Sequence, residues 1–152
     1  MKQIGDPSIE LVLVGGIVGA GKGLVAYDGL YRHVRNVPHH EVIALFQGAD
    51  AFVYPSLHEG SALAIYEALA CGLPVITTEN AGSVVRNGIE GAIVPIRDVD
   101  ALAAQILTLR DDAGLRQDMA RAARARAEDF TWARYRERLE AILDNILVPG
   151  NS

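Results

Sequence analysis

Two glutamates, Glu59 and Glu67, stand eight positions apart in a stretch of the sequence that carries almost no other charge. Glu67 is the single charged residue between positions 60 and 76. Carboxylates suit the binding of sugar hydroxyls, because each one can accept two hydrogen bonds at once. On an ideal helix, eight residues span about 12 Å and leave the side chains about 80° apart around the axis. That separation matches a ligand that runs from a sugar across a diphosphate to a ribose; the alternative is a pair of ordinary solvated carboxylates.

A helix is predicted over residues 61–71, directly after Glu59, with Gly72 as its stop signal. The first N–H groups of a helix have no partner within it and carry the positive end of the helix dipole, so an anion such as a phosphate can dock there. Small or apolar residues occupy this start, where a ligand could approach the backbone. They are Gly60, Ser61, Ala62 and Leu63. His58 could donate to a phosphate or a sugar, although an exposed turn histidine would explain it as well.

A second stretch, residues 16–22, fits the pattern G-x-x-x-x-G-K of phosphate-binding loops. The next residue is Gly23, where such loops have a serine or threonine that binds Mg²⁺. The stretch therefore predicts a plain glycine loop, with a phosphate-loop nucleotide hydrolase as the least favoured function. Gly15 and Gly16, at the end of the preceding apolar run, stay candidates for a backbone that a ligand approaches.

Short apolar runs alternate with helical patterns along the chain, and this alternation predicts an α/β fold in which helices flank a parallel sheet. Ligands of such sheets bind beyond the carboxyl ends of the strands, where glycines and small hydroxyl residues stand here. The chain is predicted to form one domain over residues 1–152, with C-terminal helices within 98–147. Strands are expected at 9–14, 34–37 (a short edge strand), 50–55, 74–77 and 91–95, and helices at 22–33, 39–48, 61–71, 98–110, 115–128 and 132–147.

Composition limits the classes of function. The chain has 152 residues, half of them apolar, which is enough for a core of its own without disulfides. Its net charge is −5, and the arginines of the last third are balanced by acids, which argues against nucleic-acid binding. Four histidines and the lone Cys71 show no metal-ligand spacing. Without a signal segment or an apolar run of about 20 residues, we expect a cytoplasmic protein with no membrane span.

The segment YPSLHEGSALAIYEALACGLPVI (residues 54–76) resembles the E-x7-E signature of retaining GT-B glycosyltransferases of family 4, the glycosyl transferases group 1. The similarity continues through residues 77–98, covers 50–56 upstream and includes the Phe-Thr-Trp step at 130–132. It implies a Rossmann-like domain, the C-terminal half of a GT-B fold, that binds a nucleotide diphosphate sugar without a metal or other cofactor. By this resemblance Glu59 is the catalytic residue that contacts the donor sugar, and Glu67 holds the ribose. The backbone of residues 60–63 approaches the diphosphate, and residues 35–37 lie near the base.

The sequence departs from that family in two places. Ser83 stands where many members have a glutamate, in a pattern similar to a polysaccharide-type subgroup. The family's first domain, which binds the acceptor, and the arginine–lysine pair that neutralises the leaving diphosphate have no counterpart here. The central first strand of the sheet is also missing, between the strands at 9–14 and 51–54. We therefore expect those two strands to pair directly, or a second chain to fill the gap.

Two functions follow from this resemblance. In the first, the chain is the donor-binding domain of an enzyme that transfers a sugar to a hydroxyl with retention, and it has little or no activity alone. Its partners would be the nucleotide sugar, an N-terminal acceptor domain on a separate chain, and further copies of itself. In the second, the chain is an inactive, truncated module that only self-associates.

Overall fold

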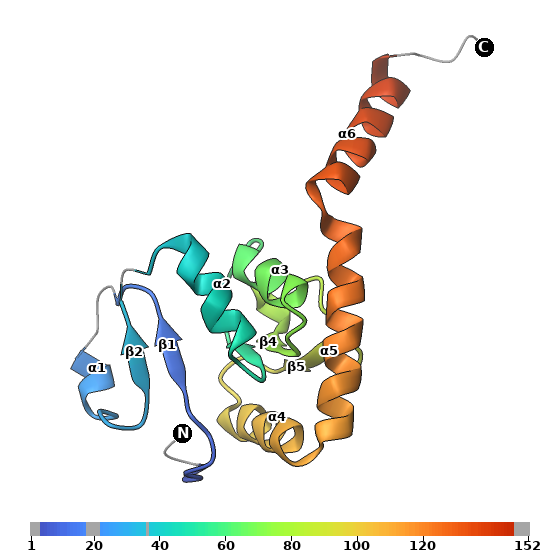
Figure 1. Cartoon of the computed structure of the whole chain (residues 1–152). Helices are drawn as coiled ribbons and strands as arrows, with labels where there is room; N and C mark the ends of the chain where they lie inside the picture. Colours follow the sequence, from blue (N-terminus) through green and yellow to red (C-terminus); the bar gives the residue numbers. More distant parts are fainter. Residues whose placement is uncertain (1–3, 18–21, 36, 148–152) are drawn as a thin grey trace.

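The computed structural model describes residues 4–17, 22–35 and 37–147 of the chain (Figure 1). Five short strands alternate with helices in this part. The strands are β1 (Val12–Val14), β2 (Arg32–Val34), β3 (Phe52–Tyr54), β4 (Val75–Thr78) and β5 (Gly91–Val94). The α-helices are α1 (Lys22–Val25), α2 (His39–Gln47), α3 (Leu63–Ala70), α4 (Val99–Asp111), α5 (Ala113–Ala127) and α6 (Trp132–Leu147), and two 3₁₀ turns are η1 (Glu79–Ala81) and η2 (Glu128–Phe130).

The strands form two separate parallel sheets. One contains β1 and β2, and the other has the order β3-β4-β5. Val53 pairs with Ile76 and Ile76 with Ala92, so β4 is the centre of the larger sheet. All pairings among the described strands are parallel. α-Helices connect the strands from β1 to β4, and η1 with a loop connects β4 to β5, which confirms the predicted α/β class.

The predicted direct pairing between the strands at 9–14 and 51–54 is wrong. Among the described strands, β1 bonds only β2, and β3 bonds only β4. The edges that would have to meet therefore belong to two different sheets. The alternative expectation, that a second chain fills the gap, stays a prediction.

The core lies on the two faces of β4, because successive side chains of a strand point to opposite faces. Val75 packs with Ile65 and Leu69 of α3 and with Ala123 of α5. Ile76, on the other face, packs with Val94 of β5, Leu109 of α4 and Met119 of α5. All four residues of β4 are buried. Helices thus cover both faces of the larger sheet, as the sequence predicted.

The prediction was least accurate between positions 22 and 37. The helix predicted over 22–33 ends at Val25, because turns follow in which Tyr27 and Leu30 bond back to Leu24 and Tyr27. Gly29 then takes a φ of +80°, a conformation that favours glycine and cannot continue a helix. The edge strand predicted over 34–37 lies at Arg32–Val34 instead, because its backbone registers on β1.

Helix α6 leaves the rest of the molecule and extends away from α5 (Figure 1). The hydroxyl of Thr131 accepts a hydrogen bond from the N–H of Arg134 at 3.3 Å and so caps the start of α6. An apolar stripe with helical spacing runs along α6, and its side chains are exposed. It consists of Trp132, Tyr135, Leu139, Ile142, Leu143 and Ile146. Within the described residues, no helix has both the length and the apolar character to cross a membrane.

Candidate functional site

Glu59 lies in the loop between β3 and α3, not on the helix. Helix α3 begins at Leu63, with Ala62 as its N-cap, two residues later than predicted. The backbone N–H of Glu59 donates to the carbonyl oxygen of Asn80 at 2.9 Å. Its carboxylate accepts from the N–H of Gly60 at 3.1 Å. Only the second half of the interval from Glu59 to Glu67 is helical, so the ideal-helix separation of the two carboxylates does not apply.

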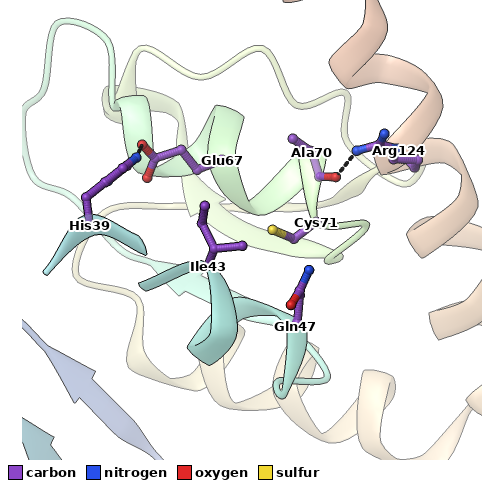
Figure 2. A pocket seen from close by; sticks show the side chains of 7 residues that line it. All are labelled: His39, Ile43, Gln47, Glu67, Ala70, Cys71 and Arg124. Atoms are coloured by element: carbon purple, nitrogen blue, oxygen red, sulfur yellow. Dashed lines mark hydrogen bonds and ion pairs between the residues drawn. The ribbon is translucent and has the colours of Figure 1, made fainter. Parts of the chain in front are cut away.

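Glu67 lies one turn into α3 and points toward the start of α2 (Figure 2). Its Oε1 is 3.7 Å from Nε2 of His39, and 36% of the Glu67 side chain is exposed. Sequence reasoning missed His39. The available signal was Pro38, which starts α2 and so places His39 in its first turn, but the approach to α3 depends on how the two helices pack.

A cavity of about 510 Å³ opens between α2, α3 and α5 (Figure 2). Glu67 and His39 lie at one end of it. Arg124 lies at the other end, where its guanidinium donates to the carbonyl oxygen of Ala70. Burial raises the pKa of the Cys71 thiol, and the negative charge of Glu67 adds to this while Arg124 opposes it. The residues that line the cavity are His39, Ile43, Gln47, Glu67, Ala70, Cys71 and Arg124.

The predicted residues around α3 stay together in the structure. His58 is exposed, Glu59 is partly buried, and Gly60 and Ser61 are exposed in the loop. Ala62 is buried beneath the helix start, whereas Leu63 is 70% exposed. The N-cap residue, Ala62, has no side chain that could cap the first turn of α3. The N–H of Ile65 donates to the carbonyl oxygen of Ala62 at 3.0 Å, which leaves the N–H groups of Leu63 and Ala64 to bind a ligand. One carboxylate thus lies before this helix start and the other after it.

Gly15 and Gly16 lie apart from that group, at the end of β1 in the smaller sheet. The N–H of Gly15 donates to the carbonyl oxygen of Val34 at 3.0 Å. The carbonyl oxygen of Gly15 lies 2.8 Å from Nε2 of His33. These contacts tie Gly15 to β2 rather than to α3. Positions 18–21 of the phosphate-loop pattern lie outside the described residues, and so the pattern stays without a structural test.

Residues 77–82 lie along the loop between β3 and α3, residues 55–62, here called the Glu59 loop. The Oγ1 of Thr77 donates to the carbonyl oxygen of Tyr54 at 2.9 Å, and Thr78 Oγ1 donates to that of Ser56. The Nδ2 of Asn80 donates to the carbonyl oxygen of Leu57 at 3.0 Å. The sequence analysis counted residues 77–98 as part of the resemblance and Ser83 as a departure from it, but it did not foresee these contacts.

The site can combine two kinds of binding. Open N–H groups at a helix start favour an anion, and the carboxylates on either side can accept hydrogen bonds from hydroxyl groups. Within the part of the chain that the structure describes, no three His, Cys, Asp or Glu side chains gather where they could hold a metal ion. The expectation that the site needs no metal stays a prediction.

Residues 2–126 match a family model described as glycosyl transferases group 1. The chain is 34% identical over 105 residues to an O-antigen chain mannosyltransferase of Escherichia coli, covering 69% of this chain and 28% of that protein. It is 32% identical over 148 residues to a D-inositol 3-phosphate glycosyltransferase of Corynebacterium diphtheriae, covering 90% of this chain and 35% of that protein. Across eight curated relatives, the chain spans between 25% and 39% of their length.

Solved structures resemble the whole described fold. Sucrose-phosphate synthase from Thermosynechococcus elongatus superposes with a TM-score of 0.79 at 26% identity, covering 90% of this chain and 38% of that one. Anabaena HepE, solved in complex with UDP-glucose, superposes with a TM-score of 0.79 at 20% identity, covering 92% of this chain and 42% of that one. The likeness to the second shows the fold alone.

Proposed function

Because this chain belongs to the glycosyl transferases group 1 family, as a C-terminal domain of the GT-B fold, we propose that it is the donor-binding half of a retaining glycosyltransferase. The reaction moves a sugar from a nucleotide diphosphate sugar to a hydroxyl acceptor. One observation carries the proposal. Glu59 and Glu67 lie before and after the open start of α3, and the cavity begins at Glu67.

The donor lies along α3 in this proposal. Glu59 contacts the sugar hydroxyls, and the backbone of residues 60–63 together with His58 contacts the sugar and the diphosphate. Glu67 accepts hydrogen bonds from the ribose, and the cavity beside it takes the nucleoside. Gly15 and Gly16 lie apart in the smaller sheet, and their contact with the donor stays a prediction. Several donor types share these features, and the UDP-glucose complex of HepE makes UDP sugars the first to test.

Catalysis is proposed to come from positioning and from stabilisation of the leaving diphosphate. The open N–H groups at the start of α3 supply part of that stabilisation, since they are fixed before the reaction begins. Retention at the anomeric carbon belongs to the same proposal. So does a donor site that works without a metal ion.

The acceptor site is proposed to lie on a separate N-terminal domain. This chain spans at most 39% of the length of the relatives compared, and the acceptor site is proposed to lie in a part that corresponds to their remaining length. The exposed apolar stripe of α6 supports contact with another folded surface, because continuous apolar patches of this kind mark interaction sites. A cytoplasmic location is part of the proposal and agrees with the free thiol of Cys71.

A second candidate is a self-associating module without a ligand. The division into two sheets favours it, because each open strand edge offers unpaired N–H and C=O groups to another chain. The apolar stripe of α6 offers a further contact. In this case copies of the chain complete each other, and the carboxylates of Glu59 and Glu67 are only solvated.

A binding panel separates the two candidates. We expect UDP, GDP or ADP sugars to raise the melting temperature of the chain and to bind in calorimetry. Glu67→Ala should weaken this binding about tenfold, since it removes the acceptor for two ribose hydroxyls. Glu140→Ala, an exposed carboxylate on α6, is the matched control. Absence of binding, or equal binding by both variants, contradicts the donor site, and a stable dimer in sedimentation would then favour the second candidate.

A further inference from the structure

The segment 77–82 begins at the end of β4 and extends its contacts with the chain that follows β3. Inside the sheet, Tyr54 and Thr77 are neighbours in the register. Past that point the polar side chains of Thr78 and Asn80 take over and donate to the carbonyl oxygens of Ser56 and Leu57. The last bond runs the other way, from the N–H of Glu59 to the carbonyl oxygen of Asn80. Each bond lies closer to Glu59 than the one before.

Gly82 closes this series. It has a φ of +56° and directly follows η1. A Cβ at this position would overlap the carbonyl oxygen of Gly60 and lie 3.0 Å from that of Glu59. The backbone of Gly82 therefore rests against the two peptide groups beside the Glu59 side chain, at a distance that only glycine permits.

Before Ala62, few side chains of the Glu59 loop are packed. Leu57 is 51% exposed and His58 is exposed, so neither anchors the loop in the core. The segment itself is firmly fixed. Thr77 and Thr78 belong to the buried strand β4, and the side chain of Ala81 is fully buried. A fixed segment thus supports a loop that is itself weakly packed.

We propose that Asn80 and Gly82 are positioning residues that hold the Glu59 carboxylate at the start of α3 and so determine how well the sugar part of the donor binds. This inference rests on the proposed function for the identity of the ligand. The Ser83 hydroxyl accepts a hydrogen bond from the N–H of Val85 at 3.0 Å and so stabilises the turn of this segment. The region around Ser83, where many family members have a glutamate, would thus affect donor binding by holding Glu59 in place.

The first test needs no ligand. Gly82→Ala should raise the hydrogen-exchange rate of the Glu59 amide about tenfold, because the collision with Gly60 breaks its bond to Asn80. Gly88→Ala is the matched control: Gly88 also has a positive φ, of +79°, but no atom lies within 4 Å of its added Cβ. Asn80→Asp keeps the shape of the side chain and replaces the donor to Leu57, and it should act in the same direction. Equal exchange in the Gly82 and Gly88 variants would overturn the proposal.

The second test compares a nucleotide diphosphate sugar with the same nucleotide diphosphate in calorimetry. Gly82→Ala should lower the affinity for UDP-glucose about tenfold relative to Gly88→Ala and should lower that for UDP less, since the proposed ribose acceptor Glu67 lies on the helix and not in the loop. Equal losses for both ligands, with normal Glu59 exchange, contradict a positioning role. If the unmodified chain binds neither ligand, the proposed function fails, while amide exchange still decides whether the segment holds the loop.

Discussion

Strands β1 and β4 show opposite relations between composition and burial. β1 is entirely apolar, Val12-Leu13-Val14, yet Val14 is 46% exposed. β4 ends in two threonines, and all four of its residues are buried. The difference lies in the neighbours, since β4 has a strand on each side and helices on both faces, whereas β1 bonds only β2 among the described strands.

The threonines of β4 also show how polar groups are accommodated in the covered sheet β3-β4-β5. Their hydroxyls donate to the carbonyl oxygens of Tyr54 and Ser56, so burial leaves no donor unpaired. Apolar composition alone thus does not make a core strand. A strand becomes part of the core when the neighbouring elements cover it, and this holds for β3-β4-β5 but not for β1-β2.

The largest expected effect tests this difference directly. Ile76→Ala in β4 should lower the free energy of unfolding by about 3 kcal/mol, because it leaves a cavity in a fully buried site. Leu13→Ala in the half-buried β1 should cost only about 1 kcal/mol. Urea denaturation of the two variants measures both values. Equal losses would mean that β1 is covered in solution, as it would be if a second chain filled the gap beside it.

An intermediate effect is expected when an ion pair beside the sheet β3-β4-β5 is compared with one beside the sheet β1-β2. Glu90 is fully buried beside Arg86, and Glu90→Gln should cost about 2 kcal/mol because a charged acceptor of several hydrogen bonds is lost. Glu10 pairs with Arg32 at 2.9 Å with both side chains largely exposed, and Glu10→Gln should change stability by less than about 0.5 kcal/mol. Similar losses of unfolding free energy for the two variants in urea denaturation would contradict the contrast between the two sheets.

The same pair predicts a pH dependence. Burial raises the pKa of Glu90, but hydrogen bonds and charge from Arg86 outweigh it, and the net pKa is lowered. A carboxyl group with a lowered pKa in the folded state stabilises the fold above its unfolded pKa, and this contribution disappears as the pH falls through the folded value. Stability of the unmodified chain should therefore fall in acid more steeply than that of the Glu90→Gln variant.

The contrast also explains which parts of the fold could be predicted from sequence. The segment from β3 to β5 was predicted well, because its apolar pattern coincides with its real burial. The stretch between positions 22 and 37 was not, since Arg32 and His33 are polar and enter a strand only through the register on β1. Backbone pairing of this kind leaves no periodic pattern in the sequence.

The candidate site divides in the same way. Glu59, Glu67 and the start of α3 are local in sequence, and their spacing pointed to them. His39 approaches Glu67 only through the packing of α2 on α3, and Gly82 reaches Gly60 only because η1 folds back on the loop. Contacts between distant segments need the tertiary structure, and the support of the Glu59 loop consists of such contacts.

The smallest expected effect concerns α6, whose apolar side chains are the least covered by the rest of the chain. Ile142 and Ile146 are 56% and 67% exposed, so changing both to serine should alter the stability of the isolated chain by less than about 0.5 kcal/mol. Thermal denaturation at several protein concentrations measures this. A larger loss that grows with concentration would show that the stripe is already covered by another copy, and would favour the self-associating module. A negligible loss, joined to weakened association with an added N-terminal domain, would identify the stripe as the contact that the isolated chain leaves open.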